Sequence, residues 1–157
     1  MKQKRAKLRQ KSLKSQLVTQ VRVYYEDTDA GGIVYHASYL KFAERARTEC
    51  VRGIGLNHQK LLADYNLLFA VKHLSIDYLA PAHLDDLLEI HTEICGHGAA
   101  TLDMRQIIRH EEKVLAALSV KLVAITPDGK VLRLPVKLRQ IMQPWLPKAT
   151  VSHSAVT

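Results

Sequence analysis

The residues best suited to chemistry lie in one short stretch of the chain, Arg22 to Tyr39, which reads RVYYEDTDAGGIVYHASY. It holds three acids, Glu26, Asp27 and Asp29, followed by a glycine pair and a histidine. Glycine lets a backbone approach a ligand closely and adopt positive φ. An ionised carboxylate can attack an electrophilic carbon or activate a water molecule. The stretch therefore has the parts of an acyl-transfer site, while loops of this composition also serve as plain turns and helix caps.

A helix is predicted to begin at the end of this stretch. From Ala37 to Ile54, apolar residues recur at steps of three and four, and charged residues occupy the opposite face. Ser38 is the predicted N-cap, and Gly53 and Gly55 are the predicted stop. A helix N-terminus offers unpaired N–H groups and a partial positive charge. Such a terminus can polarise a carbonyl oxygen that becomes negative in a transition state.

The rest of the chain predicts an antiparallel sheet. Thr19, Val21 and Val23 alternate with longer polar residues before the loop, and a period of two returns after residue 66. The four later segments, at about 73–78, 87–94, 102–108 and 114–125, are joined by short turns, which force antiparallel neighbours. One helix on one sheet face is an α+β architecture, and part of the other face is expected to meet another subunit. Smaller predicted elements are a helical turn or loop within Leu56–Tyr65, a short strand at Val131–Leu134 and a helix opening at Pro135.

The segment from Arg22 to Tyr39 resembles the active-site signature of the 4-hydroxybenzoyl-CoA thioesterase family. The matching positions are Arg22, Val23, Thr28, Asp29, Gly32, Ile33, Val34, His36 and Tyr39. The longer form, YYEDTDAGGIVYHASYLKFAERART, is most similar to the Tol-Pal-associated acyl-CoA thioesterases, the YbgC group. The likeness extends from about Gln16 to Ile141 and includes the PAHLDD turn at Pro81–Asp86.

This resemblance implies a hotdog fold, in which a curved antiparallel sheet wraps one long helix, and hydrolysis of acyl-CoA to a free acid and CoA. The catalytic carboxylate of the family falls on Asp29. The N–H that polarises the thioester falls on or next to His36, whose imidazole is a second candidate contribution. The predicted substrate-binding residues come from the same segment: Tyr25, Gly32, Ile33 and Val34.

Other charged residues receive weaker assignments. Glu26 and Asp27 match no catalytic role in the family and are predicted to be loop acids, and Glu44 is predicted to be structural. The CoA phosphates need cationic partners. Four residues on the later predicted elements are candidates, although for each of them an ordinary surface role is the favoured interpretation: Arg105, Lys121, Arg133 and Lys137.

The net charge of +8 is concentrated at the N-terminus. Residues 1–14 contain seven Lys or Arg and no acid, so the rest of the chain carries only +1 (8 minus 7). This charge pattern predicts a disordered basic tail at 1–14. The family resemblance implies a thioesterase domain at 15–143, and the remaining residues, 144–157, are predicted to be a flexible C-terminal segment. Such a tail is predicted to bind no specific nucleic acid, since no aromatic residues interleave its cations.

Several classes of site are not predicted. Two distant cysteines form neither a CxxC motif nor a disulfide framework, and the histidines lack metal-ligand spacing. Neither a metal nor a cofactor is therefore expected. No apolar run is long enough for a membrane span, and no secretory signal pattern is found, so a cytoplasmic location is predicted.

The resemblance further implies two subunits that join their sheets, hence a homodimer or homotetramer, with sites at the interface. Short- or medium-chain acyl groups are the expected substrates. The alternative is a non-catalytic, or acyl-carrier-protein-linked, hotdog partner in lipid or cell-envelope metabolism. A hotdog dehydratase is disfavoured because its His-Phe-rich motif is missing from the sequence.

Overall fold

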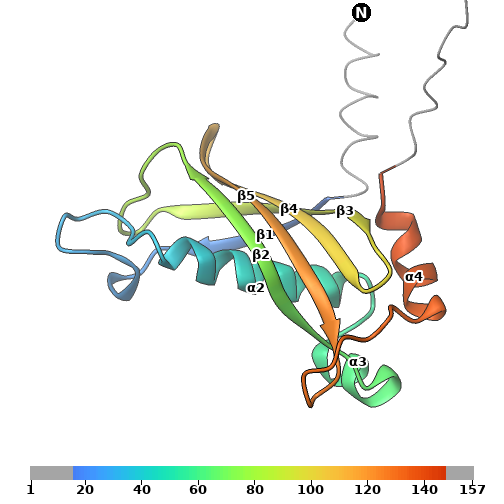
Figure 1. Ribbon diagram of the computed structural model, residues 1–157. Helices are drawn as coiled ribbons and strands as arrows, with labels where there is room; N and C mark the ends of the chain where they lie inside the picture. Colours follow the sequence, from blue (N-terminus) through green and yellow to red (C-terminus); the bar gives the residue numbers. More distant parts are fainter. Residues whose placement is uncertain (1–15, 148–157) are drawn as a thin grey trace, which may run out of the picture.

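The computed structural model describes residues 16–147. They form a sheet, one long helix and several short helices, shown in Figure 1. In chain order the elements are β1 (Gln16–Arg22), η2 (Tyr25–Asp27), α2 (Ser38–Gly53), α3 (His58–Tyr65), β2 (Leu68–Tyr78), β3 (Leu87–His97), β4 (Thr101–His110), β5 (Lys113–Ile125), α4 (Val136–Met142) and η3 (Gln143–Trp145). None of the helices in this described part is both long and apolar enough to span a bilayer.

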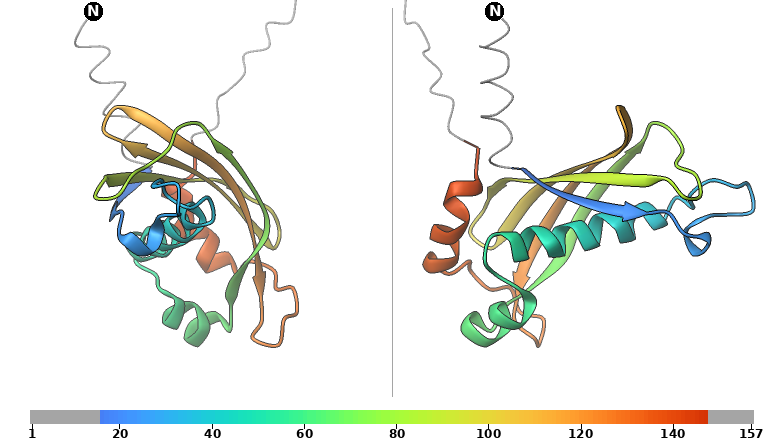
Figure 2. Two further views of the ribbon diagram at one scale, coloured as in Figure 1. Left: turned by 90° about the vertical axis from the view of Figure 1, so that its left-hand side faces the viewer. Right: turned by 180° about the vertical axis from the view of Figure 1, so that it is seen from behind.

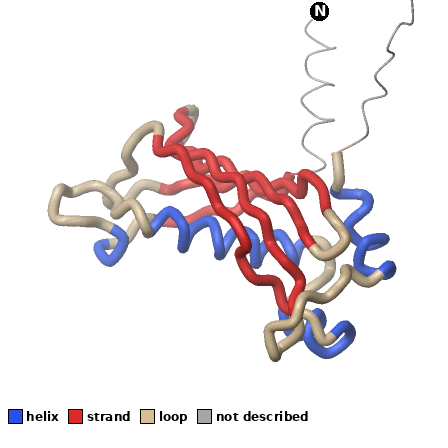
Figure 3. The backbone as a smooth tube through the Cα atoms, in the orientation of Figure 1, coloured by secondary structure: helices blue, strands red, loops and turns tan. Residues whose placement is uncertain are grey.

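The strands form one antiparallel sheet in the order β1-β3-β4-β5-β2. The sheet curves around α2, which runs along its concave side, as the end-on view in Figure 2 shows. Figure 3 shows that the connecting loops gather mainly at the two ends of the sheet. The α+β hotdog architecture predicted above is therefore confirmed.

Apolar periodicity explains how α2 and the central strands pack. On β3, Leu88, Ile90 and Ile94 are buried at alternating positions. On α2 the small residues Ala43 and Ala46 have no exposed surface, which lets the helix approach the sheet closely. Burying each large aliphatic side chain of this core contributes about 1.5–3 kcal/mol relative to leaving it exposed.

The edge strand β2 is covered much less than its neighbours. Its apolar residues Phe69, Leu74 and Ile76 pack against the core but are only half-buried. The pairing with β5 shifts between Val71 and His73. This bulge moves the alternation by one residue, so Phe69 and Val71 share a face with Leu74 and Ile76. One side of β2 thus presents an apolar stripe that α2 covers incompletely.

Some local predictions were wrong and others are confirmed. Ser38 is not the N-cap of α2: the cap is Ala37, which already has helical dihedral angles, and no side chain caps the helix. The Ser38 N–H instead donates to Tyr35 O in a turn that precedes the helix. The helix ends at Gly53, and Gly55 adopts φ +90°, as the predicted stop requires. No strand forms at Val131–Leu134 within the described chain, where a single bridge joins Val131 to Ile125.

The predicted helical segments in the second half are present. α3 lies inside the expected range, with Asn57 as its N-cap, and α4 follows Pro135. Trp145 and Leu146 pack against the core beyond the end of α4. Residues 1–15 and 148–157 lie outside the described residues, so the basic tail and the domain boundaries remain predictions.

Candidate functional site

The loop that follows β1 folds back on itself and presents Asp29 at its tip. Thr28 pairs with Val34 in an isolated bridge, the Asp29 N–H donates to Ile33 O at 2.9 Å, and the Gly32 N–H donates to Asp29 O at 3.1 Å. Gly32 has φ +81°, in the left-handed region that a residue with a side chain adopts at a cost. The glycine is therefore a requirement of this tight turn.

The two aspartates of the loop, Asp27 and Asp29, differ in burial and in hydrogen bonding. Asp27 is buried, its Oδ2 accepts a hydrogen bond from the Tyr24 N–H at 2.8 Å, and its carbonyl accepts one from the Tyr35 N–H at 2.8 Å. Asp29 is exposed, and its Oδ1 accepts a hydrogen bond from the Gly31 N–H at 2.8 Å. Asp27 shapes the loop, and Asp29 presents a carboxylate to the solvent side.

The backbone between this loop and α2 is held in a defined orientation. The carbonyl of Tyr35 accepts a hydrogen bond from the Ser38 N–H at 2.9 Å. Across a trans peptide, carbonyl and N–H point in opposite directions, so the His36 N–H points away from the body of the helix. Within residues 16–147, neither the His36 N–H nor the Ala37 N–H has an acceptor. Two adjacent donors are thus available at the start of α2.

A cavity of about 470 Å³ lies between the loop, the start of α2 and the end of β2. Its lining residues are Asp29, Ile33, Val34, His36, Tyr39, Tyr78, Leu79, Ala80 and Pro81. This volume is within the range of small-molecule sites, and the mixture of apolar walls with a few polar groups is typical of them. The structure therefore brings together Asp29, Ile33, Val34 and His36 from the set predicted by sequence.

Two of the predicted substrate-binding residues lie elsewhere. Tyr25 is 81% exposed on η2, and Gly32 is exposed at the loop turn; neither lines the cavity of this single chain. Glu26 borders a different groove, together with Arg45 and Glu49. The substrate-binding role of Tyr25 and Gly32 therefore remains a prediction.

Local pattern did not identify the residues contributed by β2 and the turn after it. Tyr78, Leu79, Ala80 and Pro81 reach the cavity because the sheet curves and brings the end of β2 beside the start of α2. The PAHLDD turn was recognisable in the sequence, but its place beside Asp29 depends on tertiary contacts. The Val34 N–H donates to Ala82 O at 2.9 Å, and Ile33 forms a bridge with His83.

Two tyrosines connect the helix start to β2 and this turn. The Tyr78 hydroxyl donates to His36 O at 2.7 Å, and the Ala82 N–H donates to the Tyr39 hydroxyl at 3.0 Å. Burial raises the pKa of both phenols. For Tyr39 the hydrogen bond from the Ala82 N–H opposes part of that increase, and weaker electrostatic interactions with Tyr78 and Asp86 raise the pKa further. Both hydroxyls therefore stay protonated at neutral pH and are able to donate.

A second polar cluster lies in the core, beside the middle of α2. Arg47 donates to Gln106 Oε1 at 3.0 Å, and Gln106 Nε2 donates to Ala43 O at 2.8 Å and to Thr92 Oγ1 at 3.1 Å. Burial lowers the pKa of Arg47, and Glu44 opposes that effect. Glu44 and Arg47 border a small cavity of about 120 Å³ distinct from the one that contains Asp29.

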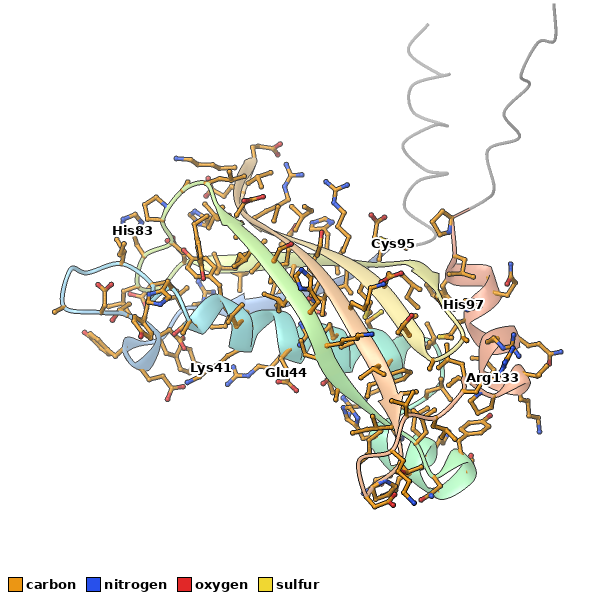
Figure 4. The ribbon with its side chains drawn as sticks, viewed as in Figure 1. Lys41, Glu44, His83, Cys95, His97 and Arg133 are labelled. Atoms are coloured by element: carbon orange, nitrogen blue, oxygen red, sulfur yellow. The ribbon has the colours of Figure 1, made fainter. Side chains whose placement is uncertain are left out.

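The candidate phosphate-binding residues do not line the cavity of this chain. Arg105 and Lys121 border a separate cavity of about 290 Å³, together with Cys95. Arg133 lies beside α4, at the end of the molecule opposite His83, as Figure 4 shows. Lys137 is exposed on α4. Among the described residues, no cluster of three or more His, Cys, Asp or Glu could hold a metal ion.

Known proteins resemble this chain in sequence. Residues 31–117 match the family model of the thioesterase superfamily. The chain is 49% identical over 105 residues to an acyl-CoA thioesterase, YbgC, from Haemophilus influenzae, covering 67% of this chain and 77% of that one. It is 47% identical over 108 residues to an acyl-CoA thioester hydrolase, YbgC, from Escherichia coli, covering 68% and 80% respectively.

Solved structures agree in fold. A probable thioesterase from Bartonella henselae aligns with a TM-score of 0.74 and 41% identity, covering 76% of this chain and 99% of that one. A 4-hydroxybenzoyl-CoA thioesterase mutant in complex with 4-hydroxybenzoyl-CoA aligns with a TM-score of 0.76 over 81% of this chain and 98% of that one, but at 16% identity it shows only the fold. The family model spans more than half of the chain, and close relatives carry the same name, so this chain belongs to the thioesterase superfamily.

Proposed function

We propose that this protein hydrolyses the thioester of acyl-CoA in the cavity that Asp29 and His36 border. The supporting observation is that one cavity is lined both by Asp29, which carries a carboxylate, and by His36, whose backbone N–H has no acceptor within residues 16–147. The relatives at 47–49% identity are named as acyl-CoA thioesterases, which supports the same substrate class here. Catalysis by Asp29 and His36 is the specific part of the proposal.

In the proposed reaction the thioester oxygen lies against the N–H at the start of α2, and Asp29 faces the carbonyl carbon. Fixed donors stabilise the negative charge that develops on that oxygen. Asp29 either takes a proton from an attacking water or attacks the carbon itself, giving an anhydride that water then opens. In both routes the C–S bond breaks, the thiolate of CoA takes up a proton, and the acyl group leaves as a carboxylic acid. The imidazole of His36 is a further proposed contributor, because His36 is one of the residues that line the cavity.

Short- and medium-chain aliphatic acyl groups are the proposed substrates. The walls near Asp29 include Ile33, Val34, Leu79 and Pro81, which suit an apolar chain rather than a charged one. The test is a panel of short, medium, long, aromatic and dicarboxylic acyl-CoAs, with CoA release followed by a thiol reagent. Cys95 is exposed, so the reagent also reads the protein thiol, and a reaction without substrate must be subtracted.

A failure to release thiol from every acyl-CoA would refute the proposed activity. It would instead favour a hotdog protein that binds a partner in lipid or cell-envelope metabolism without catalysis. Acyl-carrier-protein thioesters belong in the same panel, since acyl carrier protein is a further proposed partner. A cytoplasmic location and a link to the Tol-Pal system belong to the proposal as well, supported by resemblance to the YbgC proteins.

The proposed assembly is a homodimer or homotetramer in which two copies meet along β2. Val71 on this edge strand is 52% exposed, Tyr78 is 46% exposed and Leu79, just after the strand, is 62% exposed. An uncovered strand edge with apolar side chains invites pairing with another strand, and two-fold symmetry closes such a contact. The other edge strand, β1, differs from β2 because α2 packs against it. We therefore do not propose β1 as the contact between copies. A second copy along β2 would also lie next to the cavity, which Tyr78 and Leu79 border.

A further inference from the structure

The amide of His36 lies in a backbone segment that is anchored on its N-terminal side. The Tyr35 N–H donates to Asp27 O at 2.8 Å, which fixes the peptide before it. Tyr35 O accepts from the Ser38 N–H at 2.9 Å, which fixes the carbonyl of the same peptide unit that carries the His36 N–H. These two bonds use loop and helix backbone alone.

The C-terminal side of His36 has no such support from the helix. In a regular α-helix the Leu40 N–H would donate four residues back, to His36 O. Here the Leu40 N–H donates to Ala37 O at 3.1 Å instead. The His36 carbonyl is left to a donor from outside the helix, and the Tyr78 hydroxyl, 42 residues away in the chain, donates to it at 2.7 Å.

The phenol of Tyr78 is itself held in place. The strand β2 carries it, and Tyr78 pairs with Ala116 of β5 in the sheet. Its ring meets the Tyr39 ring edge-on, with centroids 5.4 Å apart at 77°, and the His36 ring at 6.5 Å and 88°. Aromatic pairs prefer such edge-to-face contacts. A donor fixed by a sheet and two rings positions its acceptor more firmly than one on a long flexible side chain.

We propose that Tyr78 is a positioning residue for the thioesterase reaction, whose hydroxyl locks the His36 carbonyl so that the His36 N–H faces the thioester oxygen. This inference rests on the proposed function. Only two torsions, φ and ψ of His36, separate its N–H from its carbonyl, so fixing the carbonyl restricts the direction of the N–H. A preorganised hydrogen-bond donor stabilises the transition state effectively because it does not have to reorient when negative charge develops on the oxygen. The Tyr78 bond supplies this preorganisation for the His36 N–H.

The substitution Tyr78→Phe tests this, because it removes the hydroxyl and keeps the ring contacts. The kcat for a medium-chain acyl-CoA is expected to fall about tenfold or more, short of the roughly 10²- to 10³-fold loss of a direct oxyanion donor. The KM should stay within about twofold, because the Tyr78 bond is proposed to act on the transition state and not to strengthen binding of the substrate in its ground state. Tyr24→Phe is the matched control: that phenol is 62% exposed, lies outside the cavity and should leave kcat unchanged.

A spectroscopic measurement separates positioning from a general structural role. In the Asp29→Asn background, a bound acyl-CoA labelled with ¹³C at the thioester carbon gives a carbonyl stretch that reports polarisation of the C=O bond. Adding Tyr78→Phe should move that stretch part of the way back toward its value in water, with the melting temperature within a few degrees of the parent. An unchanged stretch, or an unchanged kcat in the single variant, would overturn the proposal.

The proposed function fails in a different way. If Asp29→Asn hydrolyses acyl-CoA as fast as the parent, Asp29 is not the catalytic carboxylate, whatever Tyr78 does. The carbonyl stretch of the bound thioester depends on the helix-start donor rather than on the carboxylate chemistry. A stretch that responds to Tyr78→Phe would therefore support the positioning role even then.

Discussion

The carboxylate of Asp29 accepts the Gly31 N–H at 2.8 Å through Oδ1, while its Oδ2 has no partner within residues 16–147. The bond orients the carboxylate within the loop and leaves one oxygen for the reaction. A Cβ on Gly31 would lie 3.1 Å from that same Oδ1, so the glycine keeps the contact open. A nucleophile or general base needs a carboxylate whose orientation is fixed and which still has an oxygen free to react. Asp29 meets both conditions, because Oδ1 is held by the Gly31 N–H and Oδ2 is available.

Replacing Asp29 with Asn tests this reading. An amide oxygen still accepts the Gly31 N–H, so the loop should fold as before, but the negative charge is lost. Turnover of acyl-CoA should fall by roughly 10²-fold or more, as is typical when a general base or nucleophile is removed. Steady-state thiol release measures this, with Glu26→Gln as the control because Glu26 lies on a different groove. Turnover above about a tenth of the parent rate would refute the assignment.

The variant His36→Ala separates the backbone of His36 from its imidazole. Alanine keeps the N–H and removes a ring that contacts Tyr35 at a centroid distance of 4.5 Å. If the backbone donor carries most of the effect, kcat should drop by about tenfold or less, well below the loss in Asp29→Asn. Comparing kcat of the two variants on one acyl-CoA decides the point. A loss as large as that of Asp29→Asn would assign the reaction step to the imidazole.

The core bond between Arg47 and Gln106 predicts a stability effect. Gln106→Leu leaves the buried Arg47 guanidinium, Ala43 O and Thr92 Oγ1 without the amide that contacts them. Stranding buried polar and charged groups costs about 2–5 kcal/mol. Urea denaturation should therefore show a fall of that order in the free energy of unfolding. Arg47→Met with Gln106→Leu should cost less than the sum of the two single variants, because the groups interact; simple additivity would contradict the shared network.

Burial raises the pKa of the Cys50 thiol to about 11 from an ordinary value of 9.0. The folded protein then keeps the proton at pH values where the unfolded chain has lost it. The contribution of this thiol to stability is complete below about pH 9 and is lost as the pH rises toward 11, by about 2 to 3 kcal/mol at most. The pKa of Tyr39 is also raised by burial and acts in the same direction. Comparing unfolding of the parent and Cys50→Ala between pH 8 and 11 isolates the thiol: the variant should show the shallower fall, and identical slopes would contradict the prediction.

How far the sequence predicted the structure depended on how local each feature is. The strand alternation, the stop at Gly53 and the loop around Asp29 follow from periods and residue types within short windows. The cap of α2 was misassigned because Ser38 looks like an ordinary cap, whereas its N–H belongs to a turn that begins at Tyr35. Tyr78 was missed for a different reason: its contact with His36 spans 42 residues and exists only because the sheet curves around the helix. No pattern within β2 distinguishes that tyrosine from an ordinary strand residue.

Assembly of two copies is the last prediction, and the two edge strands provide a matched pair of variants. Val71 on β2 is 52% exposed and Val18 on β1 is 48% exposed. An aspartate at either site should therefore lower the free energy of unfolding of the isolated chain by a similarly small amount. Only the β2 edge is proposed to pair with a second copy, where a charge buried in the contact would be unfavourable.

Light scattering after size-exclusion chromatography should give at least twice the 17.7 kDa chain mass for the parent and for Val18→Asp. Val71→Asp should shift toward the single-chain mass and lose activity, because the second copy is proposed to border the cavity. A parent protein that is fully active as a monomer would contradict both the assembly and the shared site, and a Val71→Asp variant that keeps the parent's mass would place the contact elsewhere.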